Sequence, residues 1–146
     1  MSLTNAAEQA FLDLLFLNVD WTGIGDASGL QNSASAGSFY ISLHSADPGE
    51  TGDQTTSEVA YTSYARVAVA RTSGGFTRTG SSMANTALVQ FPQCTGSTAT
   101  ATHWGLGTDS SGTGNLLVKG ALSSSLSISN GIQPQFAAGA LTTTID

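Results

Sequence analysis

Charge is scarce in this sequence of 146 residues. Charged side chains make up 10% of it, against about 25% in ordinary soluble domains. Acidic residues outnumber basic ones by 10 to 4, and the net charge is −6. The four basic residues form no cluster along the chain: Arg66, Arg71, Arg78 and Lys119. Because nucleic-acid binding needs clustered cations to neutralise phosphates, we expect no nucleic-acid partner.

Cysteines and long apolar runs are also scarce. Cys94 is the single cysteine, which excludes an intrachain disulfide and a CxxC metal site. We expect its small side chain to be semi-buried. The apolar run over 10–19 is too short to cross a bilayer and is interrupted by Asp13 and Asn18. No basic residue precedes this run, so we expect no secretory signal, no membrane partner and synthesis in a cytoplasm.

The length and the apolar content of the chain are those of one folded domain. Hydrophobic residues make up 40% of the sequence, which argues against disorder. Within this domain we predict two segments: an N-terminal helix with a glycine-rich loop over 1–37, acting as an attachment arm, and a β-sandwich domain over 38–146.

The first segment begins with a predicted α-helix at about residues 5–17. Asn5 followed by Glu8 has the spacing of a capping box, with Asn5 as the cap. The loop that follows, 20–37, is rich in glycine and small polar residues and is long for a simple connection. Apolar side chains recur at helical spacing in a stripe formed by Leu3, Ala7, Ala10, Phe11, Leu14 and Leu15.

From residue 38 onward the apolar period changes to two, as in strands. Phe39, Ile41 and Leu43 alternate with polar residues, and Asn130-Gly131 is a strong turn signal. This pattern predicts a mainly β fold, an antiparallel β-sandwich of jelly-roll type with one N-terminal α-helix. Further strands are predicted at 64–71, 75–80, 88–91, 98–106, 115–122, 126–128 and 136–145.

The sequence offers no familiar catalytic motif, and we expect neither an enzyme nor a cofactor. Asp47, Glu50 and Asp53 lie in one acidic loop, either as calcium ligands or, as the neighbouring Pro48-Gly49 turn favours, as a solvated loop. His44 and His103 lie on separate predicted strands, and without a third ligand they define no zinc site. We therefore expect no bound metal and interpret both histidines as structural.

Several short motifs, in order along residues 38–142, resemble a family of small tailed-phage virion structural proteins. The longest is FYISLHSADPG, which starts at Phe39 and contains the pattern LHxADPG. The others are Tyr64-Ala-Arg66, Phe91-Pro92, Thr102-His-Trp-Gly105, Gly114-Asn-Leu-Leu117 and Phe136-Ala-Ala-Gly-Ala-Leu141.

The resemblance implies a non-enzymatic structural role in a phage particle assembled in the cytoplasm of a bacterial host. Because long fibres usually show repeats or heptads, which are not evident, we predict a capsid cement or decoration protein. Its partners would be the major capsid protein and further copies of itself, as a homodimer or homotrimer on the capsid surface. A tail or tail-fibre-associated protein is the first alternative. A carbohydrate-binding β-sandwich is the second, with Tyr40, Tyr61, Tyr64 and Trp104 as the aromatic side chains it would need.

We predict that the helix and the loop attach the protein to its partner. The candidate contact residues are Phe11, Leu14, Leu15, Phe16 and Trp21, since large apolar side chains, tryptophan above all, anchor interfaces. The competing interpretation is that the helix caps an open end of the sandwich and that Trp21 packs on the protein's own core. In a virion lattice we also expect neighbouring subunits to hold both chain ends, Met1 and Asp146, since free ends are usually poorly ordered.

Overall fold

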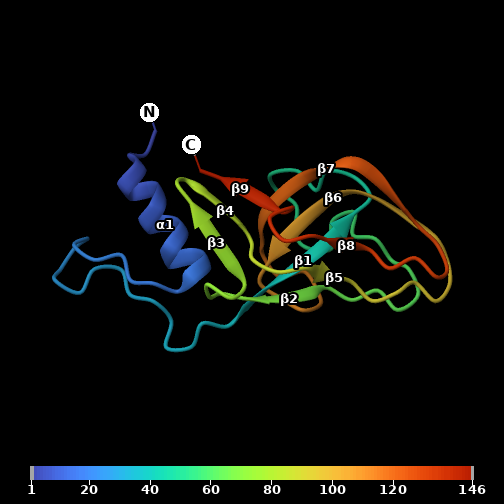
Figure 1. The fold of residues 1–146 in the computed structure, drawn as a ribbon, viewed down its shortest axis with the longest axis horizontal. Helices are drawn as coiled ribbons and strands as arrows, with labels where there is room; N and C mark the ends of the chain where they lie inside the picture. Colours follow the sequence, from blue (N-terminus) through green and yellow to red (C-terminus); the bar gives the residue numbers. More distant parts are fainter. Residues whose placement is uncertain (1, 146) are drawn as a thin grey trace. The chain divides into compact units, whose positions relative to one another are not determined.

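The computed structural model describes residues 2–145, which form one helix and nine strands (Figure 1). All strand pairings whose register is described are antiparallel. This confirms the predicted mainly β fold with one N-terminal helix, whereas the jelly-roll connectivity stays a prediction. The expectation for Met1 and Asp146 concerns residues outside the described range. The elements are α1 (Asn5–Leu17), β1 (Ser38–His44), β2 (Val67–Ala70), β3 (Phe76–Thr79), β4 (Ser82–Asn85), β5 (Val89–Gln90), β6 (Ala99–Gly107), β7 (Leu116–Ile128), β8 (Gln135–Phe136) and β9 (Thr142–Thr144).

Helix α1 has the predicted bounds but a different cap. Thr4 has extended backbone, and its hydroxyl oxygen accepts a hydrogen bond from the Ala7 N–H at 3.4 Å. The prediction that Asn5 is the cap is wrong, because Asn5 is already the first helical residue. At the other end Asn18 takes left-handed backbone, with φ of 56°, and ends the helix.

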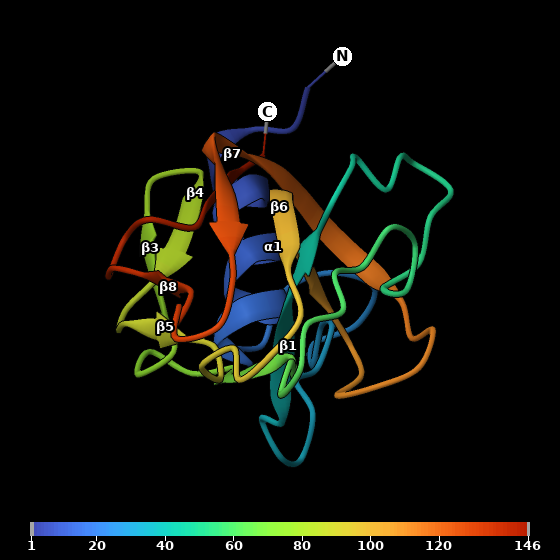
Figure 2. The same cartoon turned by 90° about the vertical axis from the view of Figure 1, so that its right-hand side faces the viewer.

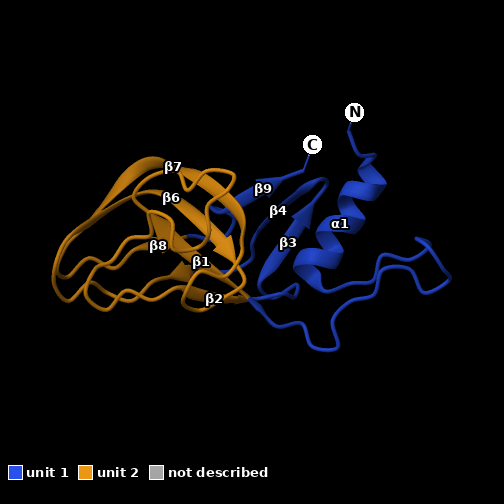
Figure 3. Ribbon diagram, turned by 180° about the vertical axis from the view of Figure 1, so that it is seen from behind, with its two compact units in different colours: residues 1–38, 70–88, 137–146 blue, residues 39–69, 89–136 orange. Residues whose placement is uncertain are grey.

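The chain folds into two compact units that alternate along the sequence (Figure 3). Unit 1 contains the residues up to 38, then 70–88, and the residues from 137 onward; unit 2 contains 39–69 and 89–136. Unit 1 thus combines the segment predicted as an attachment arm with two stretches that were predicted to lie in the β-sandwich domain. The two later segments of unit 1 carry β3, β4 and β9.

Unit 1 consists of α1 and a three-stranded sheet with the order β3-β4-β9. Helix α1 packs on β3 and β4, with the rings of Phe16 and Phe76 edge to face at a centroid distance of 5.1 Å. Strand β4 was not predicted, and the predicted strand 136–145 is interrupted: β9 joins β4, and β8 pairs with β5 in unit 2. The buried apolar side chains of unit 1 are Leu12, Phe16, Phe76, Met83 and Leu141.

Unit 2 contains a four-stranded sheet with the order β2-β1-β6-β7 and the short pair β5-β8. Strands β1, β6 and β7 run side by side (Figure 2). Strand β7 is one strand where two were predicted, and its pairing with β6 shifts register opposite residues 101–103. The buried apolar side chains of unit 2 include Phe39, Ile41, Leu43, Tyr61, Val89, Phe91, Trp104, Leu106 and Ile128.

Candidate interaction surface

Helix α1 keeps large apolar side chains at the surface although its inner side is already covered. Leu12 and Phe16 are buried in unit 1, 0% and 2% exposed. Phe11 on the other side is 42% exposed, and Leu14 and Leu15 are half-buried. A helix packed on a sheet normally turns polar residues outward, so apolar side chains away from its buried side identify a candidate contact surface.

These three side chains line a shallow groove of about 210 Å³, which we name the α1 groove. The rest of its lining comes from the loop after α1 and from the residue that follows β2: Gln31, Asn32, Ser33 and Arg71. The groove therefore combines an apolar wall from the helix with a polar rim, the composition of a protein-binding surface.

The loop that borders the α1 groove is held in one shape by its own polar groups. The Asn18 side chain accepts from the Ser33 N–H and donates to the Ser33 carbonyl, both at 2.9 Å. The Asp20 carboxylate accepts from the Asn32 N–H at 2.7 Å. Trp21 and Leu30 exchange both backbone hydrogen bonds at 2.9 Å. The predicted glycine-rich loop is therefore a closed, ordered loop.

Arg71 joins this loop to the end of α1. Its guanidinium donates to the carbonyl oxygens of Leu15 at 2.7 Å, Leu14 at 3.0 Å and Ala36 at 3.1 Å. A cation at the carboxyl end of a helix also opposes the negative end of the helix dipole. Arg71 thereby fixes the two sides of the α1 groove to each other.

The structure brings together three of the five predicted contact residues. Phe11, Leu14 and Leu15 share the α1 groove. Phe16 lies in the core of unit 1 and presents no surface, and Trp21 is half-buried in the closed loop. The sequence interpretation missed Arg71, and also three exposed apolar side chains next to α1 or within its loop: Val19, Ile24 and Leu30. The apolar residues within the glycine-rich loop, Ile24 and Leu30, could have been identified because such side chains are unusual among glycine and small polar residues.

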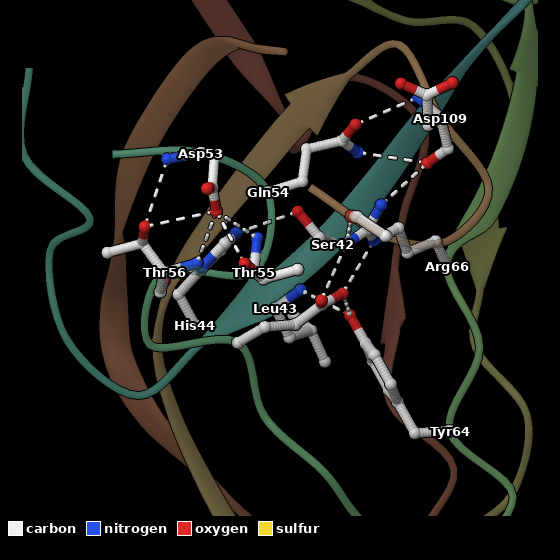
Figure 4. A network of polar contacts seen from close by, with 12 residues as sticks. Ser42, Leu43, His44, Asp53, Gln54, Thr55, Thr56, Tyr64, Arg66 and Asp109 are labelled. Carbon is white, nitrogen blue, oxygen red and sulfur yellow. Dashed lines mark hydrogen bonds and ion pairs between the residues drawn. The ribbon is translucent and has the colours of Figure 1, made fainter. Parts of the chain in front are cut away.

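A second group of polar side chains lies in unit 2, around the loop that follows β1 (Figure 4). Arg66 donates to both carboxylate oxygens of Glu58 at 2.7 Å and to the carbonyl oxygens of Asp109 and Gly112. The Tyr64 hydroxyl donates to Glu58 at 2.8 Å and accepts from the Leu43 N–H at 3.1 Å. Burial raises the pKa of Tyr64 above its ordinary value, so this hydroxyl stays a donor. The group braces two loops against the sheet.

The same region contains a serine and histidine pair. The Ser42 Oγ lies 2.8 Å from His44 Nε2, and His44 Nδ1 lies 2.8 Å from the Thr56 carbonyl oxygen. Because a carbonyl only accepts, Nδ1 carries the proton and Nε2 accepts from Ser42. Both side chains are fully buried, with 0% exposure, so no substrate reaches Ser42 in this structure. The pair joins the loop to β1 and offers no accessible nucleophile.

The burial of His44 predicts that the protein loses stability on mild acidification. Burial, the largest influence, lowers the pKa of His44 below its ordinary value of 6.5, although the Thr56 carbonyl and Glu58 oppose this and Arg66 and His103 add to it. The unfolded chain therefore takes up a proton near pH 6.5 while the folded chain does not, so stability falls as pH drops through 6.5. We expect the free energy of unfolding, measured by urea unfolding, to be lower at about pH 5.5 than at about pH 7.5.

The control for this prediction is the other histidine. In register, His103 lies directly opposite His44 on β6, and its Nδ1 lies 2.9 Å from the Thr102 hydroxyl oxygen. The variant His44→Asn should flatten the dependence on pH in this range, and His103→Asn should keep it. A dependence that survives in His44→Asn and disappears in His103→Asn would contradict the assignment.

The carboxylates of the acidic loop form hydrogen bonds and ion pairs with other groups of the protein. Lys119 lies 3.0 Å from an Asp47 oxygen and 3.1 Å from a Glu50 oxygen. Asp53 accepts from the backbone and hydroxyl groups of Thr55 and Thr56. Hydrogen bonds from Gly49 and then Lys119 lower the pKa of Asp47. Over residues 2–145, no three histidine, cysteine or acidic side chains come close enough to hold a metal ion.

None of the four aromatic side chains that a carbohydrate platform would need is exposed. Tyr61 and Trp104 are buried, and Tyr40 and Tyr64 are half-buried. The ring of Tyr64 stacks on Phe91 at a centroid distance of 6.1 Å. The alternative of a carbohydrate-binding sheet face therefore lacks the exposed aromatics it requires.

Within the described residues no helix has the length and apolar content to span a bilayer.

Comparison with known proteins places the chain in a family. No curated protein matches the sequence. One family model, described as podophage GP4 fiber I protein gp80, matches residues 2–144. This agrees with the phage structural family expected from the sequence. Since the match covers nearly the whole chain, the protein belongs to this family of podophage fibre proteins.

Proposed function

We propose that the protein is a non-enzymatic structural subunit of a podophage fibre. The observation that carries this proposal is the family match over residues 2–144, which favours the tail-fibre alternative over the capsid-cement prediction. The burial of Ser42 and His44 and the internal pairing of the acidic loop support a structural role. We keep the expectations of no nucleic-acid partner and no membrane partner as part of the proposal.

We further propose that the α1 groove attaches the subunit within the virion. The groove is apolar on its helical side, and its shape is fixed by Arg71 and by the closed loop. A surface organised in advance loses little conformational freedom on binding, which favours attachment.

Antibody labelling of intact virions separates the fibre role from the cement role. Antibodies against the purified full-length chain should label the fibres and leave the capsid shell unlabelled in electron micrographs. Label spread over the capsid shell would overturn the fibre assignment and restore the major capsid protein as the partner.

The attachment role predicts a specific defect in Phe11→Asp. A charge in the apolar wall should lower incorporation into particles by roughly tenfold to a hundredfold, because burying such a side chain contributes about 1.5–3 kcal/mol. Incorporation is measured by immunoblotting of purified particles after complementation of a phage that lacks the protein.

The matched control for this prediction is Asn5→Asp, which adds the same charge at an exposed position of α1 outside the groove. It should be incorporated like the natural protein. Equal incorporation of Phe11→Asp and Asn5→Asp would refute attachment through the α1 groove.

A further inference from the structure

Asn130 and Gly131 form the centre of an exposed turn in unit 2. The Ile132 N–H donates to the Ser129 carbonyl oxygen at 2.9 Å, and this hydrogen bond closes the turn. Gly131 has a φ of 88°, whereas the φ of Asn130 is negative, and this combination defines a type II turn. The turn therefore presents an asparagine side chain to water, directly followed by a residue that has no side chain.

These two residues can react with each other. When the Gly131 amide nitrogen loses its proton, it can attack Cγ of Asn130. The new N–Cγ bond closes a succinimide ring, while the Cγ–Nδ2 bond breaks and Nδ2 leaves as ammonia after taking a proton from water. Water then opens the ring at either carbonyl and leaves aspartate or isoaspartate. Glycine favours the attack because it has no Cβ to hinder it, and the space where a Cβ of Gly131 would stand is open.

The other asparagines of the chain lack this combination, because none of them is followed by glycine. Asn5 and Asn115 precede alanine and leucine, whose Cβ atoms hinder the attack. The Asn130 side chain makes no hydrogen bond with any residue of the described range 2–145. Three asparagines instead donate from their side-chain amides to backbone carbonyls at 2.8–2.9 Å: Asn18, Asn32 and Asn85.

The fold restrains the nitrogen that would attack. The Gly131 N–H donates to the Cys94 carbonyl oxygen at 2.8 Å, so this hydrogen bond must break before the nitrogen can turn toward Asn130. In return, the Cys94 N–H donates to the Ile132 carbonyl oxygen at 2.8 Å. The Gln93 side-chain amide donates to the Gly131 carbonyl oxygen, also at 2.8 Å. Local opening of the turn away from residues 93 and 94 therefore limits the reaction.

We propose that Asn130 is a site of spontaneous deamidation and that the hydrogen bonds of the turn to residues 93 and 94 set its rate. The inference goes beyond the proposed function and does not depend on it. Isoaspartate adds a methylene group to the main chain, so the two backbone bonds with Cys94 cannot both persist. Each modified copy also gains one carboxylate, in a chain whose net charge is already −6.

Peptide mapping of the full-length protein, stored at neutral pH, tests the site and the restraint. Deamidation should appear first at Asn130. It should be at least about tenfold slower in the folded protein than in guanidinium chloride, because two hydrogen bonds of the turn must open. Asn130→Gln should remove the signal. Another asparagine that reacts first, or equal rates at Asn130 in the folded and unfolded chains, would overturn the inference.

Gln93→Ala separates the effect of the fold from that of the local sequence. Losing the bond to the Gly131 carbonyl should speed deamidation of the folded protein about twofold to fivefold and leave the rate in the unfolded chain unchanged. The matched control is Gln90→Ala, which removes the bond of another exposed glutamine, to Gln135 at 3.2 Å, away from the turn. Equal rates for the two folded variants would contradict the restraint.

The Cys94 thiol reports the structural consequence. Its side chain is 1% exposed, so it should react slowly with a soluble thiol reagent in the unmodified protein. The isoaspartate form, separated by ion exchange through its added charge, should react faster because the backbone bonds around Cys94 are lost. Unchanged thiol reactivity in that form would mean that the turn keeps these bonds, against the inference.

Discussion

Replacing Arg66 with methionine is expected to lower the free energy of unfolding by about 3–5 kcal/mol, the largest effect at any polar residue described above. The Arg66 side chain is 3% exposed and the Glu58 side chain 15%. Without the guanidinium, Glu58 keeps a largely buried charge that nothing neutralises, and the carbonyl oxygens of Asp109 and Gly112 lose their donor. Urea unfolding followed by tryptophan fluorescence measures the loss.

Two further variants make this result specific to the buried ion pair. Arg66→Met combined with Glu58→Gln removes both charges and keeps an acceptor for Tyr64, so it should recover part of the stability. Lys119→Met breaks ion pairs with exposed carboxylates and should cause no measurable change. If Lys119→Met destabilised the protein as much as Arg66→Met, burial would not be the reason for the effect.

Phe16→Ala is expected to destabilise the protein by about 3–5 kcal/mol, the usual range for a buried phenylalanine. Phe16 is 2% exposed, and its ring meets that of Phe76 edge to face. Truncation leaves a cavity between α1 and β3, and because the helix and the strand are both regular elements, the cavity cannot easily collapse. Thermal and urea unfolding of the full-length variant give the value.

Phe11→Ala provides the comparison on the same helix. Because 42% of the Phe11 surface is exposed, Phe11→Ala should change the free energy of unfolding by no more than about 0.5 kcal/mol. Equal losses from Phe16→Ala and Phe11→Ala would mean that α1 does not distinguish a core face from a contact face. The same two variants separate the capping role predicted for the helix from its attachment role.

Periodicity predicted where α1 lies but not which side of it faces the core. The bounds 5–17 are confirmed, although the cap is Thr4 and not Asn5, because the apolar spacing that predicts a helix is a local property. The predicted stripe contains Phe11, Leu14 and Leu15, whereas the fold buries Glu8, Leu12 and Phe16. When a helix has apolar residues on two sides, either side could face the core, and packing against the sheet determines which side is buried.

The missed strand, β4, has a similar cause. In β4 the two buried side chains are Met83 and Asn85, so the expected apolar alternation contains a polar residue. Asn85 fits this position because its amide donates to the carbonyls of Ala87 and Ala137, and its oxygen accepts from the Leu141 N–H. These partners lie up to 56 residues away in the chain, so no local pattern predicts them.

The predicted turn at Asn130-Gly131 is present, but the strands on either side of it do not pair with each other. Gly131 takes a φ of 88°, which glycine adopts without strain, and Ile132 closes the turn onto Ser129. The strand after it, β8, pairs with β5 and not with β7. A local signal therefore located the reversal of the chain, while the choice of partner strand depended on distant residues.

The pairing of β4 with β9 sets an order of events during synthesis on the ribosome. Ser82 lies opposite Thr144, so the third strand of the unit 1 sheet is translated long after the first two. All residues of unit 2 have been translated by residue 136, before β9 exists. The β3-β4 pair is contiguous in the chain, whereas the contact of Ser82 with Thr144 closes a loop of 62 residues, so completing the unit 1 sheet costs more chain entropy than forming its hairpin.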